Sequence, residues 1–241
     1  MDVLDPDLLL RAYSIGVFPM SDGREARDVY WIEPRRRAII PLERFHLSRS
    51  LAKTLKSGRF EVTRDRAFTE VLRRCADRED TCINAEIERS CALLHEAGHA
   101  HSIEAWRGGE LVGGLYGVRL GGAFFGESMF SSAPDASKVA LAWLVARLIV
   151  GGFRLLDCQF MTEHLRSLGA VEIDQRAYLT LLASALGVGA ADASSRASAG
   201  SVDSAGAEPA EFGALDRLLE SRPTGSPPSG WVIVQLIGHM S

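Results

Sequence analysis

The sequence predicts a mixed α+β fold in which helices and strands alternate without a regular repeat. Apolar residues recur with helical spacing in three segments, 68–75, 87–94 and 136–150. Two apolar segments broken by glycines, 111–118 and 120–125, have the pattern of neighbouring strands. Hydrophobic residues make up 46% of the chain and charged residues 24%, the balance of a globular protein. Elements of both kinds in this order favour an α/β or α+β domain.

The elements follow one another from residue 68 onward. A first helix is expected where the apolar residues from Phe68 to Cys75 share one face. The second helix, around Ile87 to Leu94, is followed by Gly98, which is placed to end it. In the strand pair, Gly113 and Gly114 suggest a bulge or a close approach of another backbone. The remaining elements are expected in this order: a helix at 136–150, a strand at 154–160, a short helix from about Thr162 to Gly169, and a helix at 177–186.

Composition divides the chain into three zones. Residues 1–45 are rich in aromatic residues, Pro and Arg, and are expected to form a small N-terminal domain. Residues 46–186 carry most of the periodic signal and form the expected main domain. Residues 187–241, dominated by Ala, Ser, Gly and Pro, are expected to be a flexible tail because they bury little apolar surface. Within that tail, Trp231–Ile237 (WVIVQLI) has a strand-like composition.

Charge is distributed unevenly. The formal net charge is −4, so no uniform basic surface is expected. Between residues 35 and 66, however, ten Arg or Lys residues stand against three acids. A local patch of this kind can neutralise phosphates, although an ordinary solvated face gives the same pattern.

Several classes of protein are disfavoured. The four cysteines contain no C-x-x-C pair, which is typical of thiols in a reducing cytosol. The N-terminus lacks an apolar signal core, and the longest apolar stretch, 139–150, is too short to span a bilayer. His99, His101 and Glu104 resemble metal ligands, but no further ligand follows at useful spacing, so we expect no metal. The absence of a P-loop and of a G-x-S-x-G motif disfavours an NTPase or a hydrolase.

An acid at the end of an apolar strand is the first candidate for chemistry. Asp157 and Gln159 project from the same face of the strand, while Leu156 and Cys158 point to the other. A buried acid needs a partner, and the Gln159 amide could donate to it while accepting from a substrate amine. The simpler interpretation is an Asp that caps a turn.

A second candidate lies in the aromatic segment 124–130. Glu127 and Ser128 stand alone among apolar residues there, which suggests an apolar pocket with a polar wall. Such a pocket would suit a large hydrophobic side chain, with Glu127 available for a cationic amine. The alternative is a core strand whose Glu points to solvent.

Longer motifs, in order from about Leu8 to Leu182, are those of a known family. They are AYSIGVFPM (Ala12–Met20), Trp31 with Pro34 and Arg37, FHLSRSL (Phe45–Leu51), AF (Ala67–Phe68), LHEAGHAHSIEAW (Leu94–Trp106), LVGGLYGV (Leu111–Val118), GESMFSSAPDASKVAL (Gly126–Leu141), DCQ (Asp157–Gln159), HLRSLGA (His164–Ala170) and Tyr178. On these motifs the sequence resembles the bacterial leucyl/phenylalanyl-tRNA–protein transferases.

The resemblance implies a small N-terminal domain followed by a domain like the GCN5-related acetyltransferases. It implies transfer of Leu, and less readily Phe or Met, from Leu-tRNA or Phe-tRNA to a protein with N-terminal Arg or Lys. The product would be marked for N-degron proteolysis in the cytoplasm, with no membrane partner and the enzyme a monomer. No cofactor is implied, because the aminoacyl ester is already activated.

The resemblance also implies roles for individual residues. Asp157 and Gln159 would form the catalytic relay, and Trp31 would stack on the 3′-terminal adenosine of the tRNA. The amino-acid pocket would consist of Glu127, Phe124, Met129, Leu115, Leu141, Leu144 and Leu156. The tRNA phosphates would be held by basic residues of the 35–66 cluster, including Arg35, Arg36, Arg37, Arg49 and Lys53.

The chain departs from the family pattern at a few positions. The family usually has Trp where Cys82 stands and an aromatic residue where Cys91 stands. A base–aromatic stack is worth about 1–3 kcal/mol, so the loss of the Trp predicts weaker tRNA binding. Gln175 replaces a commonly basic residue.

Two alternatives stay open. One is another acyltransferase or aminoacyltransferase on the same fold. A coenzyme A-dependent enzyme needs a glycine-rich turn, and the nearest candidate, 166–171, ends in Val rather than Gly or Ala. The other is a tRNA or N-degron binding protein that has lost catalysis, which the cysteines at the two aromatic positions favour slightly.

Overall fold

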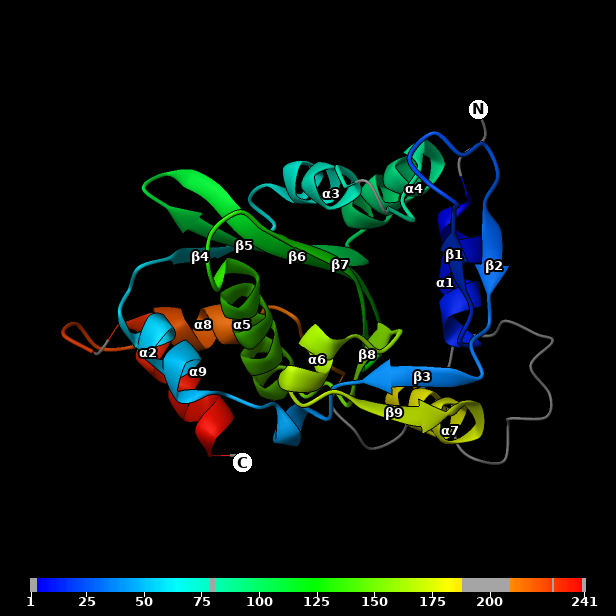
Figure 1. Ribbon diagram of the computed structural model, residues 1–241. Helices are drawn as coiled ribbons and strands as arrows, with labels where there is room; N and C mark the ends of the chain where they lie inside the picture. Colours follow the sequence, from blue (N-terminus) through cyan, green and yellow to red (C-terminus); the bar gives the residue numbers. More distant parts are fainter. Residues whose placement is uncertain (1–3, 79–80, 188–208, 227, 240–241) are drawn as a thin grey trace.

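The computed structural model describes residues 4–78, 81–187, 209–226 and 228–239. In this part of the chain seven strands form one sheet. They are β3 (Arg36–Ile39), β4 (Glu61–Arg64), β5 (Ala100–Arg107), β6 (Glu110–Leu120), β7 (Ala123–Ser131), β8 (Leu155–Gln159) and β9 (Val171–Asp174). Their spatial order is β4-β5-β6-β7-β8-β3-β9, so β7 and β8 lie near the centre (Figure 1).

All neighbouring strands in the sheet are antiparallel except β7 and β8, which are parallel. Parallel neighbours need a crossover, and the long helix α5 (Ala136–Val150) supplies it. A small second sheet pairs β1 (Phe18–Met20) with β2 (Tyr30–Ile32).

Helices cover both faces of the large sheet. The other described helices are α1 (Pro6–Ser14), α2 (Arg49–Lys56), α3 (Phe68–Ala76), α4 (Ala85–Glu96), α6 (Glu163–Ser167), α7 (Gln175–Ala185), α8 (Ala214–Glu220) and α9 (Ser229–Gly238), with a 3-10 turn at Leu42–Arg44. Figure 1 shows α3 and α4 on one side of the sheet and α5, α2, α8 and α9 on the other.

Each face of the sheet has its own apolar core. Successive strand residues point to opposite faces, so Phe124 joins the core with α2, α5, α8 and α9, while Phe125 joins the core with α1, α3, α4 and α7. We call these the α5 core and the α3 core. The α+β class predicted from the sequence is therefore confirmed.

Most of the predicted elements are confirmed within a few residues. The helices at 68–76, 85–96 and 136–150 and the hairpin of β6 and β7 lie where the periodicity placed them. Gly98 has a φ of 77°, the left-handed conformation of a residue that ends a helix. The close approach predicted at Gly113 is also present, because a Cβ built there would lie 2.5 Å from the Ala136 Cβ of α5.

The prediction of a C-terminal strand is wrong, and so is that of a flexible tail for the described residues beyond 208. Trp231–Ile237 lies within helix α9. Ile233 and Ile237, four residues apart, are both buried in the α5 core, so packing overrides the strand preference of β-branched residues. Phe212 and Leu215 of the preceding turn and α8 are buried there too. Residues 188–208 lie outside the described part.

The predicted domain boundary at residue 45 separates β3 from the other strands of its sheet. β3 precedes that boundary but belongs to the seven-stranded sheet, between β8 and β9. The separation of a small N-terminal domain stays a prediction, as does the acetyltransferase-like character of the main domain. Among the described residues, no helix combines the length and apolar character needed to cross a bilayer.

We expect Gly113→Ala to destabilise the fold by about 1–3 kcal/mol, the usual cost of overpacking a core. The new methyl group would meet the Ala136 Cβ and the α5 backbone, which cannot move aside without shifting the helix. Urea denaturation measures the change. Gly238→Ala, where nothing lies within 4 Å of the added Cβ, is the control. Equal stabilities of the two variants would contradict the close packing of α5 on β6.

Candidate active site

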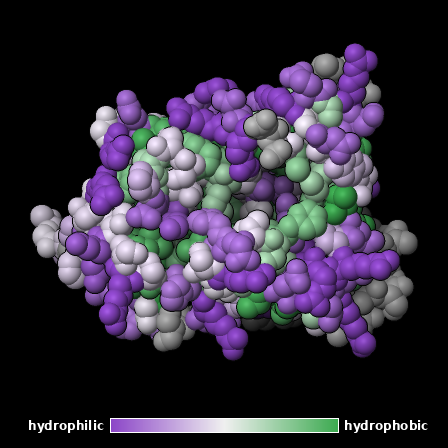
Figure 2. Space-filling view, in the orientation of Figure 1, coloured by the Kyte–Doolittle hydropathy of each residue, from purple (hydrophilic) through white to green (hydrophobic). Residues whose placement is uncertain are grey.

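The two parallel strands at the centre of the sheet separate at their carboxyl ends. Pairing between β7 and β8 runs from Ala123 with Leu155 to Phe125 with Asp157 and ends there. Glu127 and Gln159 lie just beyond the last pair, one on each strand. We call this place the β7–β8 wedge. In Figure 2 a hollow opens beside these strands, with polar residues at its floor and apolar residues around it. The carboxyl ends of strands are where open α/β sheets commonly bind ligands.

Asp157 is fully buried and fully hydrogen-bonded. Arg37 donates to it from Nε, 3.0 Å from each carboxylate oxygen, and from Nη2 at 2.7 Å. The Tyr178 hydroxyl donates to Oδ2 at 2.8 Å. The guanidinium and the phenol thus supply strong hydrogen bonds to both oxygens of this carboxylate.

Arg37 is as deeply buried as the acid that it pairs with. Its guanidinium lies between the rings of Phe18 and Tyr178, 4.7 and 4.4 Å from their centroids. It also donates to the Gly16 carbonyl oxygen at 3.1 Å. The predicted role of Arg37 in binding tRNA phosphates is therefore wrong, because its side chain is 1% exposed and its donors are used inside the protein.

Gln159 is held in an unusual backbone conformation. Its φ is 62°, in the left-handed region that side chains with a Cβ rarely adopt. Its backbone N–H donates to Asp157 Oδ1 at 2.8 Å, which stabilises this turn. Its side-chain amide donates to Glu127 Oε2 at 3.0 Å, not to Asp157 as the sequence suggested, because the left-handed turn redirects the side chain. The hydrogen bond between Asp157 and Gln159 is thus made by the backbone of Gln159.

Glu127 is aimed into the wedge by a β-bulge. Tyr116 pairs with Ser128 and Gly117 with Gly126, so Glu127 is the extra residue on β7. The Tyr13 hydroxyl donates to Glu127 Oε1 at 2.8 Å. Burial raises the pKa of Glu127 to about 7, and the donors Tyr13 and Gln159 oppose that rise. The alternative of a solvent-facing Glu is excluded by these contacts.

The apolar residues predicted to line an amino-acid pocket do gather in one place. Phe124, Leu115, Leu141, Leu144 and Leu156 are buried together in the α5 core, and Met129 is partly buried against them. Asp157 and Phe125 point to the opposite face of the sheet. Met129 is the least buried of the apolar set.

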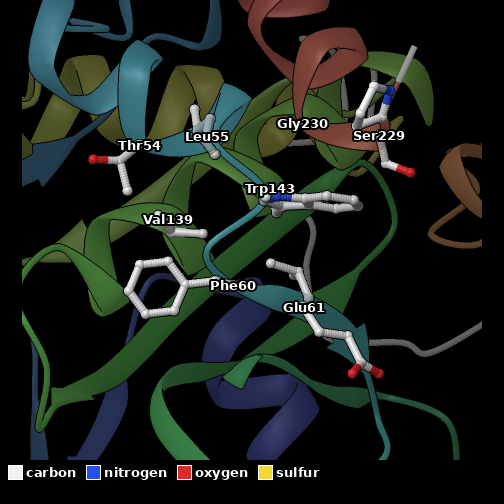
Figure 3. Close-up of a pocket in the computed structure, with 11 residues that line it drawn as sticks. Thr54, Leu55, Phe60, Glu61, Val139, Trp143, Ser229 and Gly230 are labelled. Atoms are coloured by element: carbon white, nitrogen blue, oxygen red, sulfur yellow. The ribbon is translucent and has the colours of Figure 1, made fainter. Parts of the chain in front are cut away.

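A separate cavity of about 250 Å³ lies between α2, β4, α5 and the start of α9 (Figure 3). Its walls include Phe60, Val139 and Trp143, with Glu61 at one side. None of the predicted pocket or catalytic residues lines this cavity. We place the candidate site at the wedge because the charged and strained groups lie there.

The remaining predicted tRNA contacts are spread over several elements. Arg49 and Lys53 are exposed on α2, one helical turn apart, and Lys56 follows on the same face over the ring of Trp231. Arg35 is exposed next to β3, and Arg36 pairs with Glu172. Trp31 is 39% exposed on β2.

On β5, next to β4, His101 and Glu104 resemble metal ligands in the sequence but have other partners. His101 contacts Asp65 through Nδ1 at 2.8 Å. Glu104 is buried and accepts from the hydroxyls of Thr63 and Ser102.

Sequence reasoning missed three contributors to the site, namely Tyr13, Tyr178 and the buried role of Arg37. One signal was available, because Arg37 alternates with Ile39 on a short strand that leads into the core. Tyr13 and Tyr178 stand in the family motifs, but nothing in their sequence context indicated which group each would contact. They reach Glu127 and Asp157 from helices 114 and 21 residues away in sequence.

The wedge thus brings together an acid, an amide and a buried ion pair. The sequence comparisons define the class of protein, an aminoacyltransferase. The chain matches the sequence model "Leucyl/phenylalanyl-tRNA protein transferase" at residues 39–183, and the model of the N-terminal domain of the same family at residues 2–35. It belongs to the leucyl/phenylalanyl-tRNA–protein transferase family.

Individual relatives carry the same family name. The chain is 61% identical over 248 aligned positions to the leucyl/phenylalanyl-tRNA–protein transferase of Rhizorhabdus wittichii, with all of both chains covered. It is 59% identical over 189 positions to the protein of that name from Zymomonas mobilis, covering 77% of this chain and 70% of the other. A solved structure of L-PGS from Bacillus licheniformis overlaps 65% of this chain and 53% of its own, with 15% identity and a TM-score of 0.36, too distant for any conclusion.

We expect Arg37→Met to lower the free energy of unfolding by about 3–5 kcal/mol, because it leaves the Asp157 carboxylate buried without its counterion. The adjacent Arg36→Met is the matched control. Its ion pair with Glu172 is exposed, so its loss should cost less than about 1 kcal/mol. Chemical denaturation of both variants measures the difference. Similar losses for the two variants would show that the buried pair is not needed for stability.

Proposed function

We propose that the β7–β8 wedge is where this chain transfers Leu, and less readily Phe or Met, from aminoacyl-tRNA to the N-terminal Arg or Lys of acceptor proteins. The observation that carries this proposal is the connected set of Glu127, Gln159 and Asp157, linked by hydrogen bonds at the ends of two parallel strands. The family supplies the reaction class.

The acceptor's α-amine must be neutral to attack the ester, and its reference pKa is roughly 8. Gln159 is placed to orient that amine, because among the described residues its side-chain oxygen has no partner while its nitrogen is fixed on Glu127. Asp157 holds Gln159 in the required conformation through the backbone N–H. Backbone N–H groups at the wedge would stabilise the oxyanion.

The donor's side chain would enter the α5 core at the wedge. Met129 is partly buried against that core, and an unbranched, flexible Met side chain can move aside for an incoming Leu. The same core includes Phe124 and Leu156, which pair across β7 and β8. An aliphatic pocket discriminates one methylene by only about 1–3 kcal/mol, which explains why Phe and Met would be accepted less readily but not rejected.

Binding of the tRNA backbone would rest on the exposed face of α2. Arg49 and Lys53 have no ion-pair partner among the residues that the structure describes, so both are available to phosphates. Arg35 extends this basic character towards β3. Trp31, partly exposed on β2, would stack on the terminal adenosine, while Cys82 provides no second ring.

The proposal extends to the oligomeric state, the compartment and the fate of the product. We infer that the chain acts as a monomer in the cytoplasm and that its products enter protein degradation. The four cysteines, all among the described residues, form no disulfide, which is consistent with that compartment.

Incubation with radiolabelled Leu-tRNA and a model protein tests the reaction. We expect label on proteins that begin with Arg or Lys, and at least tenfold less on matched proteins that begin with Ala or Glu. Retention of labelled tRNA without any transfer would instead identify a binding protein that has lost catalysis. Equal labelling of all four acceptors would contradict the proposed acceptor specificity.

Filter binding at several salt concentrations tests the tRNA surface. We expect Lys53→Gln and Arg49→Gln each to lower the slope of log affinity against log salt by about 1, because each removes one phosphate contact. Arg176→Gln, an exposed change on α7, is the control and should leave the slope unchanged. An unchanged slope in both α2 variants would contradict the proposal that tRNA phosphates bind to α2.

A further inference from the structure

Asp157 has no capacity left to accept a substrate proton. Oδ1 receives hydrogen bonds from Arg37 and from the Gln159 backbone, and Oδ2 receives them from Arg37 and Tyr178. The side chain is 0% exposed and paired with a guanidinium that cannot lose its proton. Proton uptake during transfer therefore has to be assigned to another group.

Glu127 differs from Asp157 in each of these respects. Each of its oxygens receives one hydrogen bond, from Tyr13 on one side and Gln159 on the other, which leaves further lone pairs on both. The β-bulge turns it into the wedge, where its side chain is only partly buried. It also contacts the amide that is placed to orient the acceptor amine.

We propose that Glu127 is the general base of the transfer reaction and that it takes the proton released by the attacking amine. This inference rests on the proposed function of the wedge. Here Asp157, Arg37 and Tyr178 act as positioning residues that fix Gln159, and only Glu127 and Gln159 touch the reacting groups.

The step balances without any further reactant. The nitrogen lone pair of the neutral acceptor amine attacks the ester carbonyl carbon, and a C–N bond forms. The nitrogen becomes positively charged and gives one proton to a Glu127 oxygen. The carbonyl then re-forms, and the bond between the carbonyl carbon and the ribose oxygen breaks. That oxygen leaves with the proton returned by Glu127, which restores the carboxylate.

The surroundings of Glu127 favour this use. Burial, with a smaller contribution from the Asp157 charge, raises its pKa to about 7, and Arg37 and the two donors oppose the rise. The other titratable groups around it are Tyr13 on α1, Cys91 on α4 and Tyr116 on β6, and burial raises the pKa of each well above neutral. These three stay uncharged near neutral pH, so Glu127 is the group that titrates there.

Single-turnover transfer measured against pH tests the inference, with a donor tRNA that carries the α-hydroxy analogue of Leu. This donor lacks the α-amine, so a group that serves only to anchor that amine has no function in the assay. With the wild-type protein we expect the log rate to rise with a slope of 2 below about pH 6.5, since both the acceptor amine and Glu127 must lose a proton. Glu127→Gln should transfer about 10²- to 10⁴-fold more slowly, with a slope of 1.

Three outcomes overturn the inference. In the first, Glu127→Gln transfers the hydroxy analogue at the wild-type rate but no longer transfers Leu. Glu127 would then serve only to anchor the α-amine of the donor. Another is a slope of 2 in the variant. The third is a pKa below 5 for Glu127, measured by carbon NMR. This measurement also tests the inference if the wild-type protein does not transfer the hydroxy analogue.

Controls separate this inference from the proposed function. Glu110→Gln, an exposed acid on the hairpin of the same sheet, should transfer at the wild-type rate. Gln is nearly isosteric with Glu, and circular dichroism and tRNA binding confirm that the Glu127 variant is folded. Absence of Leu transfer by the wild type would refute the proposed function itself, whereas a wild-type rate in Glu127→Gln would refute only the general base.

Discussion

A carboxylate and a guanidinium, both without access to water, share the centre of the sheet, and the surrounding structure is arranged to keep them together. Removing such charges from water costs several kcal/mol each, so they persist only with complete hydrogen bonding. Asp157 on β8 and Arg37 on β3 make these two strands neighbours. Tyr178 brings α7 to the same point, and the Gly16 carbonyl brings the segment after α1. One ion pair thus joins the N-terminal segment, the sheet and α7.

The same sheet gives two carboxylates opposite properties. Asp157 is paired with the fixed positive charge of Arg37, and donors occupy both of its oxygens. Glu127 has two neutral donors and a nearby negative charge, and burial brings its pKa close to neutrality. Pairs of acids whose environments differ in this way divide positioning from proton transfer. Gln159 connects them, with its backbone bonded to one acid and its side chain to the other.

Periodicity was sufficient to predict the fold class, most helices and the β6–β7 hairpin, because amphipathic segments report which face is buried. It also identified Asp157, Gln159 and Glu127 as polar residues in apolar strands. It could not show that Arg37 is buried, since an arginine in a basic run has the composition of a solvated face. Nor could it show the bulge at Glu127 or the left-handed turn at Gln159, which depend on pairing between strands. Helix α8 was missed because its few apolar residues follow a long stretch rich in Ala, Ser, Gly and Pro, whereas α9 was taken for a strand because of its β-branched residues.

These C-terminal helices affect the site indirectly, through the α5 core. The family match ends at residue 183, yet Phe212 is buried and stacks on Phe124, one of the residues beneath the wedge. Arg147 of α5 donates to Asp216 from both terminal nitrogens and to the Phe212 carbonyl, so this contact is fixed by a bidentate pair whose arginine is buried. A dense core transmits small displacements, because its side chains have few voids into which they can relax. The packing behind the proposed amino-acid pocket therefore depends on a segment beyond the family match, and in our proposal this segment limits the depth available to the donor's side chain.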